Sequence, residues 1–99
     1  MSRQITNHRK TNEQKMLYHQ DRLEYWQGII DEAEKEALRL ARQQINALPR
    51  REDDLEPDPF YVAKGLLKDN FRYQRAVGSR NGHQEAVKVY TALYLAEKA

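Results

Sequence analysis

The sequence predicts an all-α fold in which a long N-terminal helix packs on a shorter helical hairpin, a three-helix arrangement. Glycine and proline are rare, with four and three copies among 99 residues, and the segment before the first proline is rich in strong helix formers. Apolar residues recur there every three or four positions, which is the period of a helix. Charged residues make up 32% of the chain and apolar residues 39%, a balance typical of a helical globular protein.

The first predicted helix covers residues 11–48. At about 100° per residue, its apolar side chains fall within roughly 160° of the helix circumference. They are Leu23, Trp26, Ile30, Ala33, Ala37, Leu40, Ala41, Ile45 and Leu48. Such a helix would be roughly 55 Å long, which exceeds what a hairpin of two shorter helices covers. Either it bends near Gly28 and folds back, or its N-terminal half projects with an unburied apolar stripe.

Trp26-Gln27-Gly28 is similar to the Trp-x-Gly turn of the WXG-type helical hairpins. A turn at this motif would interrupt the apolar period, but the period continues through it. In addition, no tyrosine is followed four positions later by an acidic residue, as the second signal of that family requires. The motif therefore does not place the chain in that family, and we expect Trp26 to anchor a core or an interface.

Prolines and carboxylates cluster in residues 49–58, which predicts an acidic loop. Asp58 and Pro59 are suited to the N-cap and first position of a second helix, predicted at residues 59–77. Gly78 would end this helix, and Asn81 would cap a third helix at residues 82–98. The predicted buried sides are Phe60, Val62, Ala63, Leu66, Leu67, Phe71, Tyr73 and Val77 in the second helix, and Ala86, Val89, Tyr90, Leu93 and Tyr94 in the third.

The predicted organisation is a flexible basic arm at residues 1–10 followed by a single helical domain at residues 11–99. The chain has no cysteine and no apolar run long enough to span a membrane, and its N-terminus lacks the apolar core of a signal peptide. We therefore expect a cytoplasmic protein without membrane contact, or a virion protein if a phage or virus encodes it.

The sequence offers little for catalysis. The only serines are Ser2 and Ser79, and the three histidines have no metal-binding spacing. The acidic cluster before Pro59 lacks the glycine and the glutamate of a calcium loop. We therefore expect no enzyme, no metal site, no cofactor and no small-molecule substrate.

Apolar residues spaced as in a helix-packing seam predict self-association. They are Leu23, Trp26, Ile30, Ala33 and Ala37. The alanines would let two backbones approach closely. The expected function is a non-catalytic structural or adaptor module that assembles with its own copies or with another helical protein, a role that a small phage or viral accessory protein would fit.

An alternative function is nucleic-acid binding. Basic residues of the second predicted helix lie within roughly 80° of arc, and the N-terminal arm adds further cations. They are Lys64, Lys68, Arg72 and Arg75 on the helix, and Arg9 and Lys10 in the arm. The same residues are also ordinary choices for the solvated side of an amphipathic helix, so both interpretations remain open.

Overall fold

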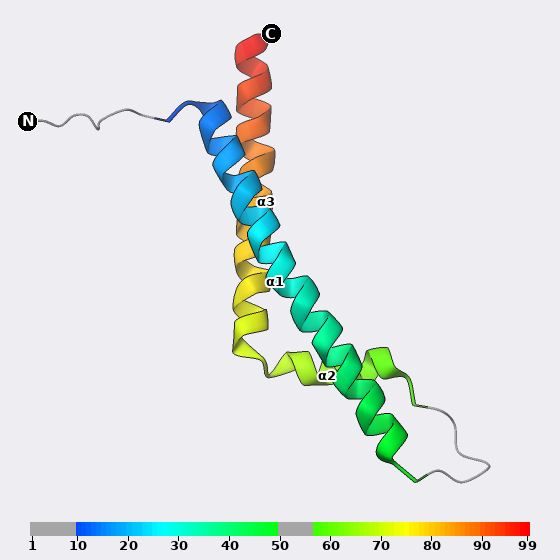
Figure 1. Cartoon of the computed structure of the whole chain (residues 1–99). Helices are drawn as coiled ribbons and strands as arrows, with labels where there is room; N and C mark the ends of the chain where they lie inside the picture. Colours follow the sequence, from blue (N-terminus) through cyan, green and yellow to red (C-terminus); the bar gives the residue numbers. More distant parts are fainter. Residues whose placement is uncertain (1–9, 50–56) are drawn as a thin grey trace, which may run out of the picture.

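The computed structural model describes residues 10–49 and 57–99, which form three helices and no strand. The helices are α1 (Asn12–Ala47), α2 (Pro59–Lys68) and α3 (Phe71–Lys98), and α1 packs against both of the others (Figure 1). This confirms the predicted all-α class and three-helix arrangement. The predicted arm, apart from Lys10, and most of the predicted acidic loop lie outside the described residues.

Helix α1 is continuous over 36 residues and passes through Gly28 without a break. It begins at a capping box, in which the backbone N–H of Gln14 donates to Thr11 Oγ1 (3.1 Å) and the N–H of Thr11 donates to Gln14 Oε1 (2.9 Å). Neither expected alternative for its N-terminal half is correct. The helix does not fold back at Gly28, and its N-terminal half does not project alone, because α3 runs beside it (Figure 1).

The predicted boundary between the second and third helices is wrong. Helix α2 ends at Lys68, and α3 begins after Asn70, whose Oδ1 accepts a hydrogen bond from the backbone N–H of Tyr73 (3.1 Å). The predicted connection at residues 78–82 and its expected cap Asn81 lie inside α3. Packing of α3 along α1 compensates for the low helix propensity of this glycine-containing stretch. The predicted start of α2 is confirmed, since Asp58 Oδ1 accepts from the N–H of Phe60 (3.0 Å).

Helices α1 and α3 run antiparallel, as Figure 1 shows. The side-chain hydrogen bonds between them follow this order, because the partner's number on α3 falls as the number on α1 rises. The pairs are Asn12 with Glu97, His19 with His83, Gln27 with Arg80 and Glu34 with Tyr73. Helix α2 crosses the other half of α1, so the two ends of α1 have different neighbours (Figure 1).

The described part of the chain is elongated and thin. Its principal-axis extents are 73 × 36 × 15 Å, and α2 crosses α1 near one end of the molecule (Figure 1). The buried core is correspondingly small and rich in alanine. It consists of Ile30, Ala37, Ala41, Ile45, Ala63, Leu67 and Ala76. With so small a core, many large apolar side chains remain exposed to solvent.

Several residues predicted to be buried are therefore exposed. The exposed fractions are 66% for Phe60, 89% for Phe71, 54% for Val89 and 45% for Leu93. Within the described part of the chain, no further helix covers them. Among these same residues, no helix has both the length and the apolar character needed to cross a membrane.

Candidate interaction surface

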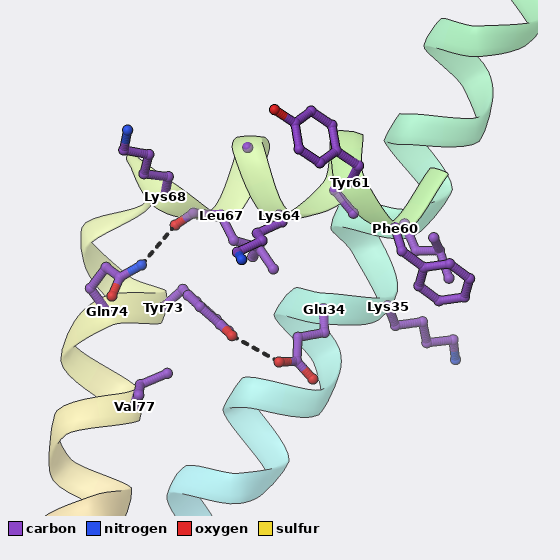
Figure 2. Close-up of a pocket in the computed structure, with 13 residues that line it drawn as sticks. Glu34, Lys35, Phe60, Tyr61, Lys64, Leu67, Lys68, Tyr73, Gln74 and Val77 are labelled. Carbon is purple, nitrogen blue, oxygen red and sulfur yellow. Dashed lines mark hydrogen bonds between the residues drawn. The ribbon is translucent and has the colours of Figure 1, made fainter. Parts of the chain in front are cut away.

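An open hollow of about 1170 Å³ lies where the three helices meet. Its volume exceeds the roughly 300–1,000 Å³ of a typical small-molecule site. Figure 2 shows that side chains from all three helices surround it. The lining residues are Glu34, Lys35 and Leu38 of α1, Phe60, Tyr61, Ala63, Lys64, Gly65, Leu67 and Lys68 of α2, and Tyr73, Gln74 and Val77 of α3. We call this surface the three-helix hollow.

Small side chains determine how close α1 and α2 lie. Ala37 and Ala41 of α1 form one buried cluster with Ala63 and Leu67 of α2. Because alanine has no atoms beyond Cβ, the two helix backbones can approach closely at this crossing. The crossing forms one wall of the three-helix hollow, since Ala63 and Leu67 also line it.

The turn between α2 and α3 forms the other wall. The carbonyl oxygen of Leu67 accepts hydrogen bonds from the backbone N–H of Asn70 (3.1 Å) and from Nε2 of Gln74 (3.2 Å). Figure 2 shows the second of these bonds, which joins the end of α2 to the first turns of α3. The two helices are therefore tied together at their junction, and the direction in which α3 leaves α2 is defined by these contacts.

Tyr73 and Glu34 connect α3 to α1 across the hollow. The phenol Oη of Tyr73 donates a hydrogen bond to Glu34 Oε2 over 2.8 Å (Figure 2). Burial, the hydrogen bond to Glu34 and the negative charge of that carboxylate raise the pKa of Tyr73. The neutral phenol is thus the favoured form, and it donates to the only carboxylate among the described residues that line the hollow.

The rim of the three-helix hollow is cationic and aromatic. Lys35, Lys64 and Lys68 are exposed, as are Phe60 and Tyr61, with exposed fractions of 66% and 78% for the two rings. Within residues 10–49 and 57–99, ion pairs join only two i, i+3 pairs of other residues, and neither involves a lysine of this rim. The hollow therefore presents apolar walls beneath a positively charged edge.

The prediction that four basic residues lie on one face of a single helix is wrong. Lys64 and Lys68 lie on α2, whereas Arg72 and Arg75 lie on α3 beyond the break at Asn70. All four side chains are exposed, but they do not share one helix face. Lys35, which the sequence analysis did not single out, instead joins the two lysines of α2 at the hollow. Only the position of the helix break could have indicated this grouping.

The two cations predicted in the N-terminal arm also do not join the lysines of the hollow in the described structure. Arg9 lies outside the described residues. Lys10 is described, and its Nζ lies 4.9 Å from the centre of the Tyr18 ring, near the start of α1. It is therefore associated with an aromatic side chain of α1 and is not among the residues that line the hollow.

The residues of the predicted self-association seam pack mainly against other residues of the same chain. Ile30 and Ala37 are buried, with exposed fractions of 2% and 5%, and Ala33 packs against the cluster that contains Ala37. Leu23 and Trp26 are half-buried. Ile30 and Ala37 therefore cannot contact a second copy without opening the chain, which corrects that part of the predicted interface.

Trp26 remains accessible within a small cation–aromatic group on α1. The guanidinium of Arg22 lies 4.5 Å from the centre of the Tyr25 ring and 5.7 Å from that of Trp26. The two rings make an edge-to-face contact, with centroids 5.2 Å apart. Tyr25 is 53% exposed, so this part of α1 offers an aromatic surface separate from the hollow.

The sequence analysis missed a pair of histidines. His19 and His83 are 64 positions apart in the sequence, but their Nδ1 atoms lie 2.7 Å apart between α1 and α3. The His19 ring also stacks on Tyr90, with centroids 5.6 Å apart. Burial and the nearby charges of His83 and Lys10 lower the pKa of His19. The antiparallel register of α1 and α3 would have indicated the pair, but no local motif does.

Two histidines alone do not make a typical metal site. In the described ranges, no group of three or more histidine, cysteine, aspartate or glutamate side chains gathers in one place. We therefore interpret the pair as a contact between two helices.

Comparison with known proteins finds no matching family model, curated protein or solved structure. The function is therefore inferred from exposure, charge and contacts alone. On these grounds the three-helix hollow is the best candidate surface, because it combines exposed aromatic side chains, an apolar wall and, among its described residues, three lysines against one carboxylate.

Proposed function

We propose that this protein is a non-catalytic interaction module that assembles with other helical protein segments, including its own copies. The observation that carries the proposal is a thin arrangement of three helices with large apolar side chains exposed on it, among them Phe60, Tyr61 and Phe71. Leaving such groups in water is unfavourable, and a partner that covers them gains roughly 25 cal/mol for each Å² of apolar surface buried.

Two surfaces support contacts of different kinds. The three-helix hollow has a cationic rim, whereas the group of Arg22, Tyr25 and Trp26 is an aromatic surface on α1. Aromatic residues and arginine are enriched at the energetic centres of protein interfaces. We assign self-association to the surface around Trp26, because Leu23 and Trp26 are only half-buried, whereas other residues of the predicted seam are buried within the chain.

Nucleic-acid binding is the second candidate function. Exposed aromatic rings beside a lysine favour it, because bases stack on such rings and phosphates attract cations. It ranks second because the inner wall of the hollow includes the aliphatic side chains of Leu38, Leu67 and Val77, which suit a protein segment better than a base. The division of the basic residues between α2 and α3 also removes the continuous row of charge that a phosphate backbone would follow.

Light scattering tests self-association. We expect the wild-type protein to have a mass of at least twice 11.7 kDa, and we expect Trp26→Ala to lower it. Tyr61→Ala is the matched control, because Tyr61 is exposed in the hollow and far along the chain from Trp26. A monomeric wild-type protein would contradict self-association, whereas an oligomer that only Tyr61→Ala dissociates would move its interface to the hollow.

A salt titration separates the two candidate functions. Phosphate contacts weaken steeply as salt concentration rises, whereas apolar helix packing does not. A labelled single-stranded oligonucleotide should bind the wild-type protein weakly or not at all. Tight, salt-sensitive binding that Lys68→Ala with Arg72→Ala abolishes would favour the nucleic-acid role instead.

A further inference from the structure

We propose that the three-helix hollow binds an acidic amphipathic helix of a partner protein. This inference rests on the proposed function and names the chemistry of the partner at one of its two surfaces. In this binding mode, apolar residues on one side of the incoming helix enter the hollow while flanking carboxylates meet its rim.

The positive charge of the rim determines which sign of charge the partner must carry. Lys35, Lys64 and Lys68 surround apolar walls, and Glu34 is the only carboxylate among the described residues of the lining. Among these described residues three cations outnumber one anion, so the rim attracts an approaching carboxylate and repels an approaching lysine. Opposite charges at the rim steer association and exclude the wrong partner.

The same charge argues against a symmetric dimer through the hollow. In such a dimer each copy would present the same surface to the other, so two surfaces with an excess of lysines would face each other. Like charges placed face to face disfavour this contact. A second copy therefore belongs on the other surface, and the hollow is left for a segment of opposite charge.

The shape of the hollow favours a helix over a small molecule. The space is open, has a volume of about 1170 Å³, and is bounded by residues of all three helices. Gly65 lies in its lining, and a Cβ built on Gly65 meets no atom within 4 Å. The absence of a side chain at this position leaves room for close approach by another backbone.

Two synthetic peptides provide the test. Each has about 15 residues, which as a helix is about 22 Å long, with leucines at helical spacing. In one peptide the flanking residues are glutamates, and in its twin they are lysines. We expect fluorescence anisotropy to show that the wild-type protein binds the glutamate peptide at least tenfold more tightly. Reversing the rim with Lys64→Glu and Lys68→Glu should reverse the preference.

A pair of glycine variants locates the binding site. Gly65→Leu places a side chain in the hollow, whereas Gly82→Leu places the same side chain at an open position on α3 outside the lining. Circular dichroism should show that both variants remain helical. Only Gly65→Leu should weaken binding of the glutamate peptide, by about tenfold or more.

Several outcomes would overturn the inference. They are equal binding of the two peptides, no binding of either, no effect of Gly65→Leu, and displacement of the glutamate peptide by an oligonucleotide. Dissociation of a wild-type oligomer by Gly65→Leu would also overturn it, because the hollow would then hold a second copy. If the wild-type protein is an oligomer that Trp26→Ala dissociates but neither peptide binds, the proposed function stands and only this inference fails.

Discussion

His19 of α1 and His83 of α3 face each other with their Nδ1 atoms 2.7 Å apart. A hydrogen bond between these atoms requires one nitrogen to carry a hydrogen and the other to lack it. If both rings are protonated, both nitrogens carry a hydrogen and the bond is lost. The contact between the N-terminal half of α1 and the middle of α3 is therefore sensitive to acid.

We predict that the free energy of unfolding decreases between about pH 7.5 and about pH 5.5. The pKa of His19 is lowered in the folded chain, so the unfolded chain binds more protons as pH falls through its ordinary value of 6.5. Stability is then fully present above that value and decreases below it. The charged or titratable groups near His19 are His83, Lys10, Tyr18 and Tyr90. Urea denaturation at several pH values measures the effect.

The control protein carries His19→Gln and His83→Gln. Glutamine can form a hydrogen bond across the same interface but does not titrate. Its free energy of unfolding should therefore change much less over this pH range. His8 is present in both proteins, so its own titration cancels in the comparison. Equal slopes for the two proteins would show that the pair does not control the pH dependence.

Replacement of two asparagines distinguishes the observed helix boundary from the predicted one. Asn70→Ala removes the N-cap of α3 and should lower the free energy of unfolding by about 1 kcal/mol. Asn81→Ala replaces an exposed residue inside α3, where alanine is the better helix former, and should be neutral or slightly stabilising. Thermal denaturation monitored by circular dichroism compares them. The reverse ranking would support a helix that begins near residue 82.

A larger residue at the crossing of α1 and α2 should destabilise the chain. Ala41 has an exposed fraction of 0% and belongs to the cluster of Ala37, Ala63 and Leu67. Ala41→Leu should lower the free energy of unfolding by about 1–3 kcal/mol, because the helices must move apart to admit it. Ala47→Leu, at an exposed position of the same helix, should change it by less than about 0.5 kcal/mol. Urea denaturation of both variants should reveal the difference, and equal effects would contradict the close crossing.

Alanine at the exposed glycines should stabilise the free chain. Gly28 and Gly78 lie inside helices, and a Cβ built on either meets no atom within 4 Å. Each substitution should raise the free energy of unfolding by about 0.5–1 kcal/mol, since alanine has the higher helix propensity. Calorimetry of the two variants would measure the gain. A loss at either position would mean that another chain approaches that glycine in solution.

Part of the candidate site could be predicted from the sequence. Lys64 and Lys68 were expected to be exposed cations, and they are. Their grouping with Lys35 was not expected, because the sequence does not show which residues of the first helix lie beside the second. Tyr73 was expected to be buried on the second helix, but it begins α3 and donates a hydrogen bond to Glu34. The missing information in each case was the partner on another helix.

The sequence by itself determined the helical class, the long first helix and the start of α2 at Asp58 and Pro59, because periodicity and capping depend on residues within one or two turns. Only the tertiary structure showed that α3 begins after Asn70 and continues through Asn81, since the packing of α3 along α1 is not visible in the local sequence. Because α3 begins after Asn70, it is 28 residues long and lies beside the N-terminal half of α1. This arrangement places His83 beside His19. The three-helix hollow follows from it as well, because the break after Lys68 turns α2 away from α3.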